Sequence, residues 1–128
     1  MSDRSVEAAN KKIVLDMWHK VINERDLAQA PNYIVEDYIQ NSPSAGQGRA
    51  AMLEFFKIEL GGAEPRPKSE VKYTKFEHVI AEGDLVQLMF KRKMKSPNDP
   101  SRIIEVWWYD TYRLKNGMIV EHWDSALE

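Results

Sequence analysis

Residues 102–124 read RIIEVWWYDTYRLKNGMIVEHWD, and this stretch decides the fold. Two runs rich in β-branched and aromatic residues flank an Asn-Gly pair at residues 116–117, a pattern that predicts a β-hairpin. Side chains of a strand alternate between two faces, so the length of the turn determines which side chains share a face. The turn length is therefore the first question that the sequence raises.

A two-residue turn is the shorter possibility. The Asn-Gly pair would then connect Lys115 directly to Met118 as a cross-strand pair. Counting back along both strands, this register sets Asp110 opposite Trp123. Asp110 would then lie on the opposite face of the hairpin from His122 and Asp124.

A three-residue loop gives a different arrangement. Gly117 takes the left-handed conformation, Leu114 pairs with Met118, and Asp110 lies opposite His122. The ionisable and aromatic side chains then gather on one face: Trp108, Asp110, Tyr112, His122 and Asp124. The opposite face carries Trp107, Tyr109, Thr111, Arg113, Ile119, Glu121 and Trp123. Propensity alone does not choose between the registers, since both loops are common.

The rest of the chain predicts helices first and strands afterwards. Residues 6–24 carry apolar side chains at helical spacing, shorter helical pieces are expected over residues 25–37, and another helix over residues 49–60. Strands are expected over residues 69–81, 84–95, 102–114 and 118–126. This order is typical of the α+β class. If the antiparallel sheet is strongly curved and wraps around about three helices, it forms a cone that encloses a pocket.

One face of each strand would point into such a pocket. On the strand over residues 84–95 we expect this face to carry Val86, Leu88 and Phe90. From the helices, Trp18 and Phe56 are candidate ligand contacts. Because an amphipathic helix must also cover a core, Trp18 has a purely structural alternative role.

Composition restricts the function class. A chain of 128 residues with 43% hydrophobic and 30% charged residues is expected to form one globular domain over residues 1–128. The net charge of −2 provides no general attraction to nucleic acid or to anionic membranes. The chain has no cysteine and no zinc-type cluster, so we expect no metal. Without a signal-like or membrane-length apolar run, a cytoplasmic protein is expected.

The hairpin resembles that of a known family. The pattern D-x-x-R-x-x-x-G-x-I-x-E-H-W-D over residues 110–124 is similar to the C-terminal hairpin of SnoaL-like polyketide cyclases. The YIQNSP segment at residues 38–43 and the order of the elements extend the likeness over nearly the whole chain. These cyclases belong to the cone-shaped superfamily of ketosteroid isomerases, limonene epoxide hydrolases and nuclear transport factor 2. The bacterial SnoaL-like aldol-condensation branch is the most similar. The hairpin face that carries the family residues is the one built by the three-residue loop, so the resemblance favours that loop.

The resemblance implies catalytic roles for three residues. The proposed acid/base of the cyclases falls on Asp124, and an apolar hollow would favour its protonated form near neutral pH, as an acid/base catalyst requires. An exposed, inert Asp at a strand end is the alternative. The cyclases' companion His falls on Asp110, so the sequence departs from the family pattern there. Asp110 and His122 would orient or return the proton, or would form a polar pair that only fixes the register.

The residue Asn41 suggests a second relative. A Gln-Asn-x-Pro segment resembles limonene epoxide hydrolases, in which the Asn helps to position a nucleophilic water. Their Arg-x-Asp pair would fall on Phe90 and Arg92, so that catalytic set is incomplete. Asn41 is therefore expected to be a polar ligand contact, beside Trp108 and Tyr112.

These observations predict a cofactor-independent acid/base enzyme for a small hydrophobic carbonyl substrate, with cyclase, aldol-condensation or isomerase chemistry. A non-enzymatic small-molecule binding protein and a scaffold are the alternatives. The aromatic row of Trp107, Tyr109 and Trp123 would be an exposed apolar patch, which predicts a homodimer. No nucleic-acid or membrane partner is expected.

Overall fold

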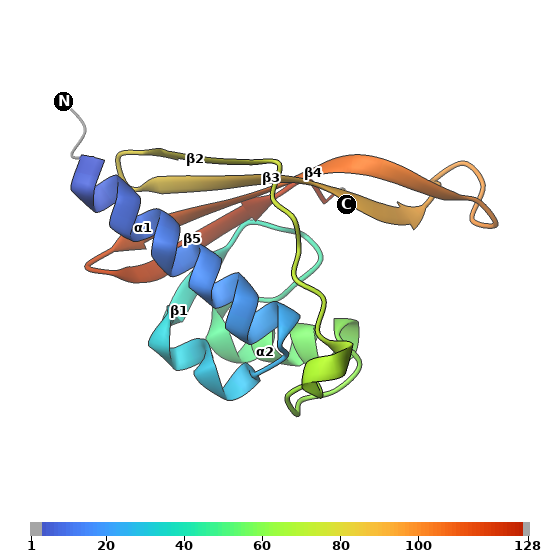
Figure 1. The fold of residues 1–128 in the computed structure, drawn as a ribbon, viewed down its shortest axis with the longest axis horizontal. Helices are drawn as coiled ribbons and strands as arrows, with labels where there is room; N and C mark the ends of the chain where they lie inside the picture. The colour runs from blue at the N-terminus through green and yellow to red at the C-terminus, as the bar shows by residue number, and fades with distance from the viewer. Residues whose placement is uncertain (1–3, 127–128) are drawn as a thin grey trace.

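The computed structural model describes residues 4–126 as one curved sheet with helices packed on one side (Figure 1). The N-terminal elements are α1 (Arg4–Met17), the π-helical turn η1 (Trp18–Asn23), the 3-10 helix η2 (Leu27–Asn32), β1 (Ile34–Gln40), α2 (Gly48–Glu59) and the 3-10 turn η3 (Lys68–Glu70). The strands β2 (His78–Glu82), β3 (Leu85–Lys95), β4 (Ile103–Lys115) and β5 (Met118–Asp124) follow. The expected α+β cone is confirmed.

The sheet has one strand more than expected. Its order is β1-β5-β4-β3-β2, and β1 joins it by parallel pairing with β5, whereas the other neighbours are antiparallel. The prediction of short helical pieces up to residue 37 was therefore wrong from Ile34 onward. A parallel pair between strands so far apart in the chain leaves no local sequence signal, because no turn joins them.

The strand expected over residues 69–81 is shorter. Only β2, at the end of this range, pairs with β3. The preceding residues are held by the helical layer instead: Thr74 exchanges hydrogen bonds of 3.0 and 3.2 Å with the Asn23 side chain, and Phe76 packs edge-on against Trp18. Polar and aromatic contacts with η1 thus replace the expected sheet ladder.

The turn between β4 and β5 is the two-residue one. Asn116 and Gly117 both have positive φ angles, 52° and 77°, and they connect Lys115 to Met118. Positive φ at both central residues defines a type I′ turn, whose twist matches that of the flanking strands. The three-residue loop is therefore wrong.

A bulge at Val120 changes the register beyond the turn. Leu114 still pairs with Ile119, but Arg113 pairs with Glu121, so Val120 is left over. One extra residue in a strand turns the following side chains to the other face. The pairs beyond the bulge are Thr111 with Trp123, Tyr112 with His122, and Asp110 with Asp124.

The bulge produces the expected grouping of faces with one exception. Asp110, Tyr112, His122 and Asp124 share the inner face. Ile119, which we expected on the outer face, lies before the bulge and is fully buried on the inner face. The prediction for Ile119 was wrong because a bulge separates it from Glu121 and Trp123.

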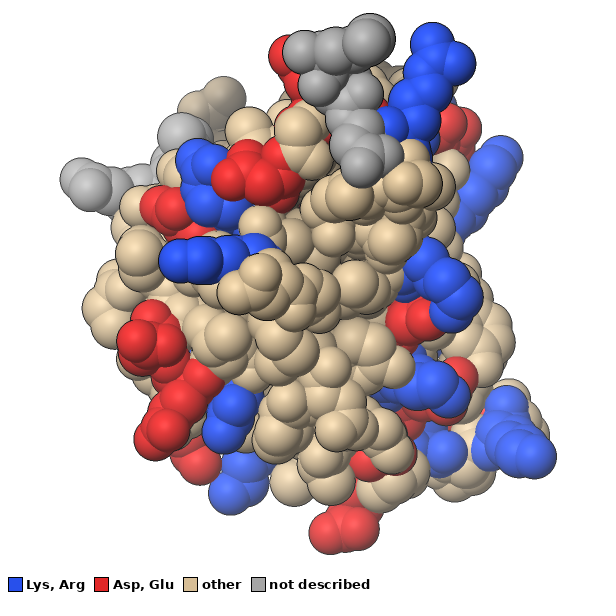
Figure 2. Space-filling model, turned by 90° about the vertical axis from the view of Figure 1, so that its left-hand side faces the viewer, with Lys and Arg blue, Asp and Glu red and all other residues tan. Residues whose placement is uncertain are grey.

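The hydrophobic core lies between the sheet and the helices. Its fully buried members include Val14 and Val21 from the helical layer and Val86, Leu88 and Ile119 from the sheet. Beyond this core, the β3–β4 hairpin extends past the helices (Figure 1). Acidic and basic side chains are interspersed on the face seen in Figure 2. Within residues 4–126, no helix has the length and apolarity that crossing a membrane requires.

Candidate active site

A cavity of about 490 Å³ opens between the helices and the inner face of the sheet. Apolar and aromatic side chains form most of its wall. The polar and ionisable residues of the wall are Tyr38, Gln40, Ser42, Ser44, Glu59, Arg92, Asp110, Tyr112, His122 and Asp124. A mostly apolar hollow with a few converging polar groups is the usual form of a small-molecule site.

The cavity brings together most of the residues that we expected there. The wall contains Asp110, His122 and Asp124 as well as Trp18, Phe56, Phe90, Trp108 and Tyr112. Trp18 also packs against the core, so its two expected roles coexist. Three expected contacts are not part of the wall: Asn41, Val86 and Leu88.

These three residues lie elsewhere for simple geometric reasons. Strand alternation turns Gln40 and Ser42 inward and Asn41 outward, where its amide donates to Glu121 Oε2 and to the His122 carbonyl, both at 3.1 Å. Val86 and Leu88 do face inward, but they are fully buried in the core between the sheet and the helices.

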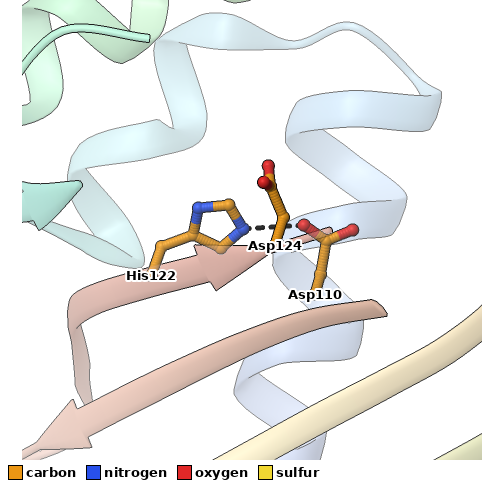
Figure 3. Close-up of side chains that lie close together, drawn as sticks. All are labelled: Asp110, His122 and Asp124. Carbon is orange, nitrogen blue, oxygen red and sulfur yellow. Dashed lines mark hydrogen bonds and ion pairs between the residues drawn. The ribbon is translucent and has the colours of Figure 1, made fainter. Parts of the chain in front are cut away.

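The ionisable centre of the cavity consists of Asp110, His122 and Asp124 (Figure 3). His122 Nε2 lies 2.7 Å from Asp110 Oδ1, and both side chains are buried. Asp124 follows on the same strand as His122, is half-buried, and has a side chain that rises beside this pair (Figure 3). Two carboxylates and an imidazole therefore share one small space.

Gln40 determines the tautomer of His122. The backbone N–H of Ser42 donates to Gln40 Oε1 at 2.9 Å, and Gln40 Nε2 donates to Tyr38 Oη at 2.6 Å, which fixes the orientation of the amide. His122 Nδ1 lies 2.9 Å from Gln40 Oε1. Because an amide oxygen only accepts, Nδ1 must carry a proton.

The same reasoning places a proton between Asp110 and His122. With Nδ1 protonated, the 2.7 Å contact needs one proton on either Nε2 or Asp110 Oδ1. The pair is thus imidazolium with carboxylate, or imidazole with carboxylic acid. Its net charge is zero in both forms.

Burial raises the pKa of Asp110 above its ordinary value of 3.8. The hydrogen bond from His122 opposes this effect, the negative charge of Asp124 adds to it, and Arg92 opposes it. The desolvation of a carboxylate in an apolar wall is the largest cause. Asp110 is therefore suited to holding a proton.

Asp124 is the carboxylate that remains available to a ligand. Its Oδ1 accepts the backbone N–H of Ala126 at 3.0 Å, whereas its Oδ2 has no hydrogen-bond partner among residues 4–126. A carboxylate oxygen of this kind, on the wall of an apolar cavity, can accept a proton from a bound molecule.

Sequence reasoning missed six polar residues of the wall: Tyr38, Gln40, Ser42, Ser44, Glu59 and Arg92. Alternation along the Tyr-Ile-Gln segment was a usable signal for the first two, once residues 34–40 are recognised as a strand. Arg92 is two residues from Phe90 on β3, so it lies on the same face of the strand. Its guanidinium lies 4.4 Å from the centre of the Trp108 ring. We expected this residue to belong to a solvated basic run.

A metal ion is a poor fit to this centre. Ligand atoms of Asp110, His122 and Asp124 lie within 4.8 Å of one another. Both ring nitrogens of His122 are already engaged, however, by Gln40 and by Asp110. A histidine ligand needs a free nitrogen lone pair, so a metal would have to break the Asp110–His122 contact.

Three solved structures illustrate the likeness of the whole fold. Bal32a, from a soil-derived mobile gene cassette, has a TM-score of 0.68 at 17% identity, over 93% of this chain and 89% of that one. A proposed polyketide cyclase from Acidithiobacillus ferrooxidans has a TM-score of 0.67 at 16% identity, over 91% and 87%. IdmH from Streptomyces antibioticus, also a proposed polyketide cyclase, has a TM-score of 0.65 at 18% identity, over 91% of this chain and 89% of that one.

Sequence comparison adds the family. No curated protein matches the chain at a significant level. The model of the SnoaL-like domain matches residues 15–122, which is most of the chain. The hairpin motif, the cone and this match agree, and the protein belongs to the SnoaL-like family.

Proposed function

We propose that the protein is a cofactor-independent acid/base enzyme that acts on a small hydrophobic carbonyl compound. The observation that carries this function is the position of Asp124. Its Oδ2 has no partner among the described residues, in an apolar cavity, directly beside a buried histidine–carboxyl pair. The family membership and the cyclase descriptions of its structural neighbours support the same reaction class.

Proton transfer is the first step of this chemistry. The Asp124 carboxylate removes a proton from the carbon next to the substrate carbonyl, and the C–H electron pair becomes an enolate. The enolate then attacks a second carbonyl carbon of the substrate, which closes a ring and gives an alkoxide. That alkoxide takes the proton back from Asp124, so no cofactor is consumed. In an isomerase, the proton returns to a different carbon instead.

The Asp110–His122 pair makes this step electrostatically feasible. An ionised Asp110 alone would repel both Asp124 and a developing enolate. The proton held between Asp110 and His122 keeps the pair neutral overall. We assign the pair a positioning role, because Gln40 and Asp110 already occupy both nitrogens of the ring.

Epoxide hydrolysis has less support. It requires an amide that holds a nucleophilic water. The Gln40 amide is engaged by Ser42, Tyr38 and His122. The Asn41 amide is bound outside the cavity.

Hydrogen–deuterium exchange tests the function without knowledge of the natural substrate. Apolar methyl ketones such as 2-acetonaphthone are incubated with the protein in D2O, and loss of the α-proton signal is followed by NMR. We expect exchange above the buffer rate, and a loss of about 100-fold or more in Asp124→Asn. Glu105→Gln, which removes an exposed carboxylate from β4, is the control and should exchange like the wild type.

Two results would refute the proposed enzyme activity. Exchange that continues undiminished in Asp124→Asn would remove the proposed base. Ketones that bind to wild type and to Asp124→Asn alike, with no exchange in either protein, would identify a binding protein instead.

A further inference from the structure

Two tyrosine hydroxyls on the cavity wall share an unusual hydrogen-bonding state. Tyr38 Oη accepts a hydrogen bond of 2.6 Å from Gln40 Nε2, and Tyr112 Oη accepts one of 2.8 Å from Trp18 Nε1. Both tyrosines line the cavity, although they come from β1 and β4, on either side of β5. In each case the hydroxyl oxygen acts as an acceptor.

The two donors cannot reverse their roles. An indole N–H only donates, and edge-on contacts with Phe76 and Phe90, both at 5.3 Å between ring centres, hold Trp18 in place. The Gln40 amide is oriented by the Ser42 N–H, which requires Oε1 on its side. The Gln40 NH2 group must therefore face Tyr38.

Each hydroxyl is left with a proton to donate. A phenol has one O–H donor, and neither Tyr38 nor Tyr112 has an acceptor for it within hydrogen-bonding distance among residues 4–126. Burial also raises the pKa of Tyr38 to about 12 and the pKa of Tyr112 well above its ordinary value, so both phenols keep this proton.

The two tyrosines are neighbours across β5, because His122 pairs with Tyr112 on β4 and with Gln40, two residues from Tyr38, on β1. A charge on Tyr38 raises the pKa of Tyr112, and the charges of Asp110 and Asp124 act on both phenols. We propose that Tyr38 and Tyr112 form a two-donor site for the carbonyl oxygen of a ligand, in the cavity that the Asp124 carboxylate also lines. This assignment rests on the proposed function, since it names the group of the carbonyl substrate that binds and where it binds.

Such a site complements proton abstraction by Asp124. As the α-proton leaves, negative charge moves onto the carbonyl oxygen, and fixed donors that already point there stabilise it. Two neutral hydroxyls provide this stabilisation without a positive charge. On the Tyr38 side, the chain from His122 Nδ1–H through the Gln40 amide polarises the donor in one direction.

Ligand binding by a ketone and its alkene isostere tests the site. The probes are 2-acetonaphthone and 2-isopropenylnaphthalene, which differ in having C=O or C=CH2 at one position. Their affinities are measured for wild type, Tyr38→Phe, Tyr112→Phe and the double variant. Tyr109→Phe, on the exposed outer face of β4, is the matched control.

We expect each inner variant to weaken ketone binding about five- to tenfold and to leave alkene binding unchanged. Unchanged alkene binding also shows that the variant has folded with its cavity intact. In infrared spectra, the C=O stretch of the bound ketone should lie at lower wavenumber in wild type and shift upward in each inner variant.

The result that overturns the site is a ketone that binds no tighter than the alkene, or a C=O band that neither inner variant moves. This failure differs from failure of the proposed function. A protein with the band shift but without α-proton exchange would support the carbonyl-oxygen site and refute the enzyme activity. A protein with Asp124-dependent exchange but without the band shift would support the enzyme activity and refute the carbonyl-oxygen site.

Discussion

Asp110 on β4 and Asp124 on β5 are directly paired across the hairpin, so two carboxyl groups face each other on the cavity wall. Like charges in opposed positions of a sheet destabilise it. The proton that Asp110 shares with His122 removes one of the two charges. The histidine therefore makes it possible for an ionised Asp124 to lie in this position.

The raised pKa of Asp110 predicts a pH-dependent cost to stability. The folded protein keeps the Asp110 proton above pH 3.8, the ordinary pKa, where the unfolded chain has released it. The stability that this group contributes is thus complete at low pH and is lost as the pH rises through the raised pKa. We expect Asp110→Asn, which is neutral throughout, to lack this loss.

Urea denaturation at several pH values measures the effect. The stability of Asp110→Asn relative to wild type should increase with pH above about 4, with a slope of at most about 1.4 kcal/mol per pH unit. For Glu36→Gln, an exposed change on β1, the free energy of unfolding should depend on pH as it does in wild type. If the unfolding free energies of Asp110→Asn and wild type depended on pH in the same way, the pKa of Asp110 would be the same in the folded and the unfolded protein.

Arg92 borders the cavity and should act on Asp110 from there. Its guanidinium favours the ionised form, so Arg92→Gln should raise the pKa of Asp110 further. Lys93→Gln removes the same charge from the next residue of β3, which is not part of the cavity wall, and should have a smaller effect. Carbon-13 NMR of labelled aspartate carboxyls follows the titration. Equal effects of the two variants would indicate net charge rather than a local contact.

Tyr38 should ionise late in an alkaline titration. The difference in phenolate absorbance between wild type and Tyr38→Phe should have its midpoint at about pH 12. Because the folded pKa is raised, the stability that Tyr38 contributes is lost as the pH rises from about 10 through that value. A midpoint near 10 in the folded protein would show that the phenol is hydrated and not held in the cavity.

The two-residue turn should tolerate different changes at its two positions. Gly117→Ala places a side chain at a φ of 77°, with no atom close enough to clash, so its cost is conformational, about 1 kcal/mol in free energy of unfolding. Asn116→Gly removes a side chain at a φ of 52° and should be nearly neutral. Chemical denaturation compares both with wild type. A stable Gly117→Ala and a destabilised Asn116→Gly would contradict the type I′ geometry.

The sequence was sufficient for the grouping of side chains in the hairpin but not for its register. A three-residue loop and a two-residue turn followed by a bulge each add one residue, so both bring Asp110, His122 and Asp124 to one face. Nothing about Val120 distinguishes it as a bulge, because a valine fits a regular strand equally well. The correct face was predicted with an incorrect pairing.

The rest of the site depends on contacts that no local pattern contains. Tyr38 and Gln40 reach the hairpin only because β1 pairs with β5, and Asn41, the residue that family resemblance emphasised, faces outward for the same reason. Arg92 is exposed, as expected of the basic run at residues 91–95, and it also borders the cavity. Strand alternation, applied to β1 once its extent is known, turns Tyr38 and Gln40 inward and Asn41 outward.

The parallel pairing of β1 with β5 also has a consequence for the order of folding. Gln40 and His122 are 82 positions apart, and closing so long a loop costs entropy before any contact compensates for it. The β3–β4 and β4–β5 hairpins are local and can form early. We therefore expect the cavity to mature in the slowest refolding phase, so that a refolding chain acquires its hairpins before it acquires affinity for a ligand.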